Sequence, residues 1–127
     1  MTYILVVDDE HAITDFVFDA LSDEGYNIAI CHDGASALVS IYERHPDLVL
    51  LDIGLPVMTG DLVLRELRSR GFALLPVIVA TAGTNAEQYL AHGATAILKK
   101  PFTLDNLLDT VATHALSESG PLHESVA

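Results

Sequence analysis

Short, nearly uninterrupted apolar runs alternate along this chain with longer segments in which apolar residues recur every three or four positions. Such runs are typical of strands that are buried on both faces of a parallel sheet. They predict five strands, at residues 4–7, 27–31, 48–51, 77–81 and 96–100. The run at 48–51 has the character of a central strand, and it is followed by Asp52 and then by the turn residues Gly54 and Pro56.

Each predicted strand is followed by a segment with the period of an amphipathic helix. Four of these segments have clear apolar faces, formed by Ile13, Phe16, Val17, Ala20 and Leu21, by Ala37, Leu38 and Ile41, by Leu62, Val63, Leu64 and Leu67, and by Leu104, Leu107, Leu108, Val111, Ala115 and Leu116. In the third helix we expect Arg65, Glu66, Arg68 and Arg70 to point outward.

Cap and turn residues indicate where the helices begin and end. The third helix can be capped by Thr59 or by Asp61, and Thr103 caps the last one. Residues 84–87 have the form of a capping box for a short fourth helix that reaches only to His92. Residues that end a helix follow the first three segments, at Gly25, Pro46 and Gly71.

The alternation of strand and helix through short connections predicts an α/β fold, a parallel sheet with helices on both faces. The 127 residues contain no repeat and no linker, which indicates one domain. We place this domain at residues 1–118 and expect the polar residues 119–127 to form a flexible C-terminal tail. Ligand sites in such sheets lie beyond the carboxyl ends of the strands.

Five residues with functional groups stand at those strand ends: Asp8, Asp9, Asp52, Thr81 and Lys100. Three neighbouring carboxylates raise one another's pKa unless a positive charge intervenes, and a hard divalent cation such as Mg²⁺ would supply that charge. The cluster has no cysteine and no nearby histidine, which argues against zinc. We expect His11, the histidine next to the acids in sequence, to be a solvated surface residue.

A carboxylate beside Mg²⁺ can attack a phosphoryl group and become an aspartyl phosphate, so Asp52 is the candidate nucleophile. Lys100 would neutralise a phosphoryl oxygen, and the Thr81 hydroxyl would donate a hydrogen bond to another. Neighbouring strand residues point to opposite faces, and we choose Lys100, at the end of its strand, over Lys99. Each residue alone also fits an ordinary role as a cap, a strand residue or a surface charge.

The composition narrows the classes of partner. A formal net charge of −12 disfavours direct binding to nucleic acid or to anionic lipid and is compatible with a bound cation and a protein partner. No apolar run approaches the ~20 residues of a membrane span. The single cysteine, Cys31, excludes an intramolecular disulfide and fits a reducing compartment, so we expect a cytoplasmic protein.

At this point the sequence resembles the receiver domains of two-component response regulators. The matching pieces are ILVVDDE at 4–10, LDIGLPVMTG at 51–60, VATA at 79–82, GA at 93–94 and KPF at 100–102. They occur in the family's order with near-family spacing, and the resemblance covers residues 3 to about 116. No single piece is decisive, but the ordered set is highly specific.

The resemblance implies a flavodoxin-like, doubly wound sheet of strand order 2-1-3-4-5. It implies that Asp52 accepts a phosphoryl group from a sensor histidine kinase or a histidine phosphotransfer protein. Mg²⁺ would be bound by the side chains of Asp9 and Asp52, by the backbone carbonyl of Gly54, and by Asp8 mainly through water. Thr81 and Lys100 would contact the phosphoryl group, and the peptide bond from Lys100 to Pro101 would be cis.

We therefore expect a receiver in a phosphorelay that signals to a downstream protein through phosphorylation-dependent contact. It would be a phosphoacceptor rather than a turnover enzyme, and a monomer or weak dimer. We expect it to stand alone, since no effector domain fits into the last eleven residues.

Three features depart from the family's usual pattern. Ile97 stands three residues before the lysine, where receivers usually carry a Tyr or Phe that swings inward during the switch. The segment from Thr81 to Gly93 is shorter than usual by roughly one helical turn. Gly54 and Gly83, each two residues after a site residue, leave the approach to the phosphoryl group open.

Three alternatives belong to other classes. A haloacid-dehalogenase-like phosphatase needs a second Asp two residues after the nucleophile, where this chain has Gly54. A flavodoxin-like FMN binder needs a Ser/Thr/Gly-rich phosphate loop after the first strand, where the acidic residues 8–10 would repel a phosphate. A receiver-like module that binds its partner without phosphorylation is left open by Ile97 and the short fourth helix.

Overall fold

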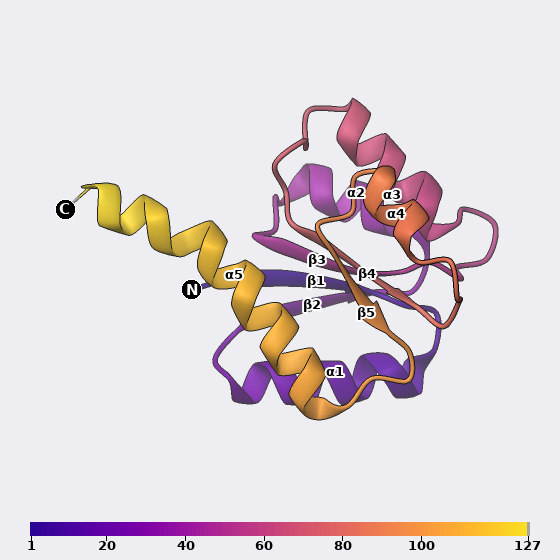
Figure 1. The fold of residues 1–127 in the computed structure, drawn as a ribbon, viewed down its shortest axis with the longest axis horizontal. Helices are drawn as coiled ribbons and strands as arrows, with labels where there is room; N and C mark the ends of the chain where they lie inside the picture. The colour runs from indigo at the N-terminus through magenta and orange to yellow at the C-terminus, as the bar shows by residue number, and fades with distance from the viewer. Residues whose placement is uncertain (127) are drawn as a thin grey trace.

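Five parallel strands form one sheet with helices on both faces (Figure 1). A computed structural model describes the backbone of residues 1–126 and the side chains of residues 1–115. The strands are β1 (Tyr3–Val7), β2 (Asn27–Cys31), β3 (Leu48–Asp52), β4 (Val77–Thr81) and β5 (Ala96–Lys99). The helices are α1 (His11–Asp23), α2 (Gly34–Glu43), α3 (Gly60–Ser69), α4 (Glu87–Ala91) and α5 (Leu104–Val126). The strand order β2-β1-β3-β4-β5 confirms the expected doubly wound topology.

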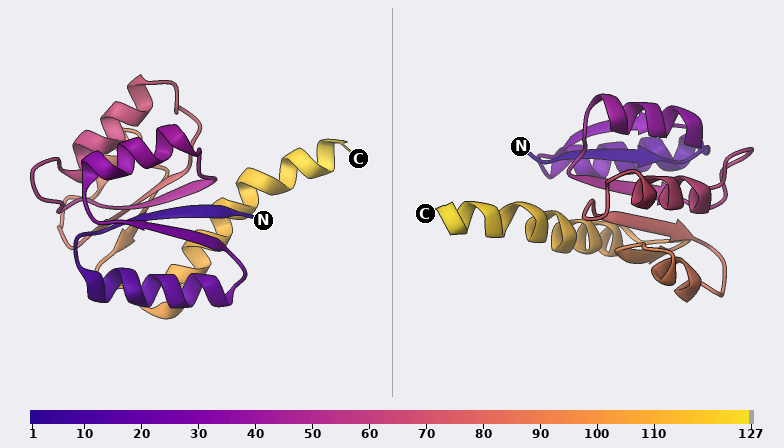
Figure 2. Two further views of the ribbon diagram at one scale, coloured as in Figure 1. Left: turned by 180° about the vertical axis from the view of Figure 1, so that it is seen from behind. Right: turned by 90° about the horizontal axis from the view of Figure 1, so that it is seen from above.

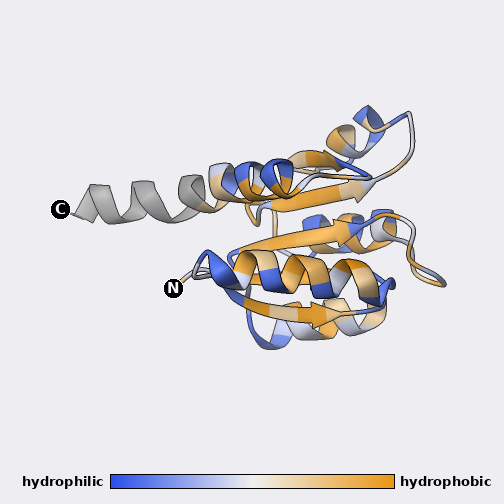
Figure 3. Ribbon diagram, turned by 90° about the horizontal axis from the view of Figure 1, so that it is seen from below, coloured by the Kyte–Doolittle hydropathy of each residue, from blue (hydrophilic) through white to orange (hydrophobic). Residues whose placement is uncertain are grey.

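Alternate residues of each central strand face opposite layers, which explains why these strands are apolar throughout (Figure 3). In β1, Leu5 and Val7 pack in a core with α2 and α3, whereas Ile4 and Val6 pack in a second core with α1 and α5. All five residues of β1, β3 and β4 are buried.

Helices α1 and α5 cover one face of the sheet, and α2, α3 and α4 cover the other (Figures 1 and 2). The strands all point away from the two chain ends, so their carboxyl ends gather on the opposite side of the molecule (Figure 1). In the part of the chain that the structure describes, none of the helices combines the length and apolarity that a membrane crossing requires.

Several predicted helix and strand ends need correction. The capping box at 84–87 is wrong: α4 begins at Glu87 after Ala86, which has helical dihedral angles and makes no side-chain cap hydrogen bond. Thr59, rather than Asp61, caps α3, with its hydroxyl accepting from the Leu62 N–H at 3.3 Å. Strand β5 ends one residue earlier than predicted, which leaves Lys100 just beyond the sheet.

Helix α5 continues to Val126, past the position where the apolar pattern ends. Thr103 caps it as predicted, because its hydroxyl accepts from the Asn106 N–H at 3.1 Å. The side chain of Leu116 lies outside the described residues, and the division into a domain at 1–118 and a flexible tail at 119–127 stays a prediction.

Two side-chain predictions for the helix surfaces are also wrong. Arg68 does not point outward but lies half-buried between α3 and the segment after α4, where its guanidinium donates to the carbonyls of Gly93 and Phe72. The apolar faces are narrower than predicted, because Phe16, Leu62 and Leu104 are all more than 40% exposed. The hydrophobic period shows which side of a helix faces the core, but not whether the residues at the edges of that side are buried.

The loop between β3 and α3 holds a strained residue next to the predicted site. Val57 has a φ of 65° and is the one non-glycine residue with positive φ among those described. The Met58 N–H donates to the Pro56 carbonyl at 2.7 Å, which closes a tight γ-turn around Val57. A β-branched residue is disfavoured in this region, at a cost of about 1–2 kcal/mol.

Replacing Val57 by Gly is therefore expected to stabilise the protein. The Val57 side chain is fully exposed, so its removal costs no packing. Glycine removes the backbone strain, but it loses more conformational entropy on folding than valine does, which offsets part of the gain. We expect a net gain of about 0.5–1 kcal/mol, seen as a rise of roughly 2–4 °C in the thermal unfolding midpoint. Val57→Ala keeps the Cβ atom and is the control, with a smaller rise. If Val57→Gly melts at or below the wild-type midpoint, the backbone at Val57 is not strained enough to destabilise the protein.

Candidate functional site

The carboxyl ends of four strands bring the predicted site residues together. Asp8 follows β1, Asp52 ends β3 and Thr81 ends β4, and all three are at least 94% buried. Lys100 follows β5, and its backbone N–H donates to the Thr81 carbonyl at 2.9 Å, which holds the lysine at the edge of the sheet. Asp9 is exposed at the rim of the same pocket. The arrangement follows directly from the parallel sheet, whose strands all end on one side.

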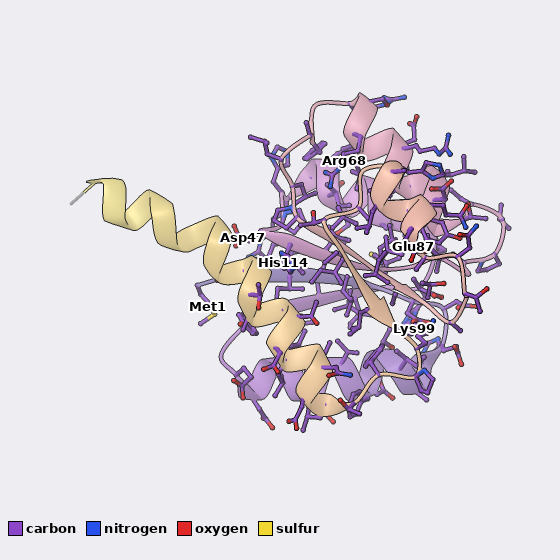
Figure 4. The ribbon with its side chains drawn as sticks, viewed as in Figure 1. Met1, Asp47, Arg68, Glu87, Lys99 and His114 are labelled. Carbon is purple, nitrogen blue, oxygen red and sulfur yellow. The ribbon has the colours of Figure 1, made fainter. Side chains whose placement is uncertain are left out.

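The Lys100 ammonium lies between two buried carboxylates. Its Nζ is 2.9 Å from Asp8 Oδ2 and 3.1 Å from Asp52 Oδ1, and the exposed Glu10 lies farther away, at 3.9 Å. Lys99 is exposed at the tip of the β5 arrow in Figure 4, so Lys100 is the lysine that faces the acids. The peptide bond between Lys100 and Pro101 is cis, as the resemblance implied.

Two opposing effects set the pKa of Lys100. Burial lowers the pKa of its ammonium, but the hydrogen bonds and negative charges of Asp8 and Asp52 outweigh burial and raise the pKa above its ordinary value. Lys100 is therefore a cation at neutral pH. Its contribution to stability is present below the ordinary lysine pKa and is lost as the pH rises through the raised folded value.

The three carboxylates could hold a cation. Asp8, Asp9 and Asp52 each offer an oxygen, and these oxygens all lie within 4.8 Å of one another. Three carboxylates against one ammonium leave excess negative charge, which a divalent cation would neutralise. An all-oxygen ligand set with one rim open to solvent suits Mg²⁺, which keeps several of its waters. The residues present therefore fit that ion.

The space around Asp52 and Thr81 is open. Asp52 Oδ1 accepts from Lys100 and from the Gly54 N–H at 3.3 Å, whereas Oδ2 accepts no hydrogen bond from the described residues. A Cβ atom at Gly54 would stand 3.8 Å from Oδ2, and one at Gly83 would stand 3.4 Å from the Thr81 hydroxyl. These glycines leave room for an incoming group beside the carboxylate.

Thr81 is oriented by the backbone that follows it. Its Oγ1 accepts from the Gly83 N–H at 3.0 Å, which leaves the hydroxyl hydrogen available for donation. Thr81 ends the strand next to that of Asp52, and among the described residues its hydroxyl has one hydrogen bond still to donate.

The sequence predicts no histidine near the acid cluster, but the structure places His32 there. His32 Nδ1 lies 3.0 Å from the backbone carbonyl of Asp8. The contact is with the peptide carbonyl of Asp8 and not with a carboxylate. The signal was available in the strand order: β2 neighbours β1, Cys31 is paired with Val7, and the next residues, His32 and Asp8, lie side by side.

Comparison with known proteins places this geometry in a family. The model of the response regulator receiver domain matches residues 4–112. The response regulator MprA of Mycobacterium avium is 41% identical over 108 residues, which are 83% of this chain and 47% of that protein. The same regulator of Mycobacterium ulcerans is also 41% identical over 108 residues, covering 83% of this chain and 46% of its own. The chain thus spans about half the length of these curated relatives.

Solved structures of response regulators also resemble this chain. The receiver domain of NtrX from Brucella abortus superposes with a TM-score of 0.82 at 40% identity, covering 91% of this chain and 99% of that one. The chemotaxis response regulator CheY4 of Vibrio cholerae superposes with a TM-score of 0.84 at 33% identity, covering 89% and 98%. With the family match spanning both the acid cluster and Lys100, the chain belongs to the response regulator receiver domains of two-component systems.

Proposed function

We propose that this receiver accepts a phosphoryl group on Asp52 from a histidine kinase or a histidine phosphotransfer protein. The observation that carries the proposal is the position of Lys100 Nζ, within 3.1 Å of both Asp8 and Asp52. An ammonium held there neutralises charge at the point where an anionic phosphoryl group must approach a carboxylate. The protein acts as a phosphoacceptor and not as a turnover enzyme.

The transfer is a displacement at phosphorus. Asp52 Oδ2, free of hydrogen bonds from the described residues, supplies the electron pair for the new O–P bond. The P–N bond to the donor imidazole breaks, and its electron pair returns to that nitrogen. Lys100 balances charge on one phosphoryl oxygen, and the Thr81 hydroxyl donates to another.

Mg²⁺ completes the site. Asp9 and Asp52 would bind it through their side chains, Gly54 through its carbonyl, and Asp8 mainly through water. The carboxylate oxygens within 4.8 Å of one another support this ligand set. When bound, the ion neutralises negative charge on the carboxylates and on the phosphoryl oxygens.

The output is phosphorylation-dependent contact with a downstream protein in the cytoplasm. An apolar groove of about 380 Å³ beside Lys100 offers a surface for a protein partner, lined by Ala12, Ile13, Phe16, Ala82, Lys100, Pro101 and Phe102. The expectations of a stand-alone chain and of a monomer or weak dimer stay predictions, which native mass measurement on the protein from its own cells would check.

Ile97 supports a second candidate function, contact that does not depend on phosphorylation. Its side chain packs against the core formed by α2 and α3, where it cannot act as a swinging aromatic ring. Helix α4, of five residues, is short as expected, and it begins later than the predicted capping box at 84–87. A receiver with these features would present the same partner-binding surface whether or not it is phosphorylated.

Incubation with phosphoramidate and Mg²⁺ tests the acceptor role directly. We expect intact-mass spectrometry to show a gain of one phosphoryl group, and we expect EDTA to prevent it. Amide NMR spectra with and without beryllofluoride and Mg²⁺ then separate the two candidate functions. Shifts confined to the pocket favour phosphorylation-independent contact, whereas shifts that extend over α4 and β5 favour a switch. A chain that gains no mass in the presence of Mg²⁺ contradicts the acceptor role.

A further inference from the structure

Every polar group of Asp8 is held by a neighbour. Its N–H donates to the Cys31 carbonyl at 3.1 Å, and its carboxylate accepts from the Glu10 N–H and from Lys100 Nζ, both at 2.9 Å. Its carbonyl oxygen lies 3.0 Å from His32 Nδ1. Because a carbonyl oxygen can only accept, Nδ1 must carry the hydrogen in this contact.

The His32 side chain links the ends of β1 and β2 just beyond their last backbone hydrogen bond. Strands β1 and β2 pair in parallel as far as Val7 and Cys31, and the bond from the Asp8 N–H to the Cys31 carbonyl is the next rung. The chain then leaves the sheet, because Asp33 is the N-cap of α2 and its side chain accepts from the Ser36 N–H at 2.7 Å. His32 lies between the end of β2 and the start of α2, and its imidazole N–H donates to the Asp8 carbonyl.

The His32 ring is itself fixed from the other side. The His11 ring stacks on it with centroids 3.9 Å apart and planes 18° apart. His11 begins α1, directly after the acidic residues 8–10. His11 is exposed, as the sequence predicted, but it is stacked rather than free. The segment 8–11 therefore contacts His32 at both ends, through the Asp8 carbonyl and through the His11 ring.

We propose that His32 is a positioning residue for the metal site: its Nδ1–H fixes the Asp8 peptide and so aims the carboxylates of Asp8 and Asp9. Its contacts are with the Asp8 carbonyl and the His11 ring, and it acts on the cation only through those acids. The role rests on the proposed function, since it requires that these acids bind Mg²⁺. Groups that orient metal ligands in this way typically contribute about 10–100-fold in metal affinity.

Calorimetric titration of Mg²⁺ into the metal-free protein at one fixed pH tests this role without any phosphoryl transfer. His32→Phe keeps a ring that can stack on His11 but has no donor, and His32→Leu is a second variant without a donor. His32→Asn places an amide N–H close to the position of Nδ1. We expect each donorless variant to bind Mg²⁺ about tenfold more weakly than wild type, and the Asn variant to recover most of that loss.

The outcomes separate this role from the proposed function. Wild-type affinity in His32→Phe or His32→Leu overturns the positioning role and leaves the metal site intact. Equal losses in the Asn variant and the donorless variants show that an N–H donor at this position does not restore the affinity, and they also overturn it. If the wild-type protein binds no Mg²⁺, the metal site itself fails, and the role of His32 fails with it.

Discussion

The Asp52→Asn variant is expected to take up no phosphoryl group from phosphoramidate, whatever the Mg²⁺ concentration. Replacing one carboxylate oxygen by an amide nitrogen removes the nucleophile, because the neutral amide has no oxygen that can form a stable acyl phosphate. The side chain keeps nearly the same shape, and its remaining oxygen can still accept from Lys100 and Gly54. Intact-mass spectrometry after a fixed incubation measures the loss.

Glu10→Gln provides the matched control. Glu10 is an acid at the same edge of the sheet, but its side chain is 64% exposed and stands 3.9 Å from Lys100 Nζ, against 3.1 Å for Asp52. Its loss changes the net charge by the same amount as the loss of Asp52. We therefore expect the Glu10 variant to be labelled like the wild type. Labelling that persists in Asp52→Asn would place the acceptor on another residue.

The apolar runs predicted the ends of the five strands to within one residue. The physical reason holds fully for β1, β3 and β4, which are buried along their whole length. A strand that is buried on both faces has no polar positions, so its whole length is visible as one run. The residue that ends the run is then the residue at the edge of the sheet. Asp52 and Thr81 end β3 and β4 in this way, and Asp8 and Lys100 stand one residue beyond β1 and β5.

The strand order could not be obtained in the same way. Each run shows where a strand lies, but not which strand lies beside it, and the order came from the family resemblance. That order places Cys31 beside Val7, but it does not show that the next residues, His32 and Asp8, make a contact. This contact joins residues 24 positions apart through a side chain and a backbone carbonyl, and no local pattern signals such a pair.

Local patterns also failed where tertiary contacts decide the outcome. Arg68 lies on a predicted polar face, yet the backbone carbonyls of Gly93 and Phe72 need donors at that point, and its guanidinium supplies them. Burial lowers the pKa of this guanidinium, which still stays charged at any ordinary pH. The capping-box pattern at 84–87 likewise matched by composition alone, because α4 is too short to fix its own first turn.

Replacing Gly60 by Ala is expected to be the most destabilising small substitution near the site. Gly60 begins α3, and its N–H donates to the Ile53 carbonyl at 3.1 Å, which draws the helix end against the end of β3. A Cβ atom here would meet the Ile53 Cα at 2.8 Å and would come closer still to the Asp52 carbonyl oxygen. Both are backbone atoms, of Asp52 at the end of β3 and of Ile53 directly after it, so neither can rotate away.

Either α3 or the end of β3 must move to admit that methyl group. We expect a loss of about 3 kcal/mol in the free energy of unfolding, at the upper end for overpacking, and a thermal midpoint lower by roughly 10 °C. Because the displaced backbone includes Asp52, Mg²⁺ affinity should fall as well. Thermal denaturation followed by circular dichroism, and calorimetry on the folded variant, measure the two effects.

Gly54→Ala separates steric contact from the mere loss of a glycine. Gly54 lies in the loop between β3 and α3, but a Cβ atom there would meet only the Asp52 carboxylate oxygens, at 3.8 and 3.9 Å, which is ordinary van der Waals contact. We expect its thermal midpoint to stay within about 3 °C of wild type, since the change amounts to less than ~1 kcal/mol. A Gly60 variant as stable as the Gly54 variant would show that α3 can move away from β3 at little cost. The close approach of α3 to β3 would then not be what fixes the backbone of Asp52.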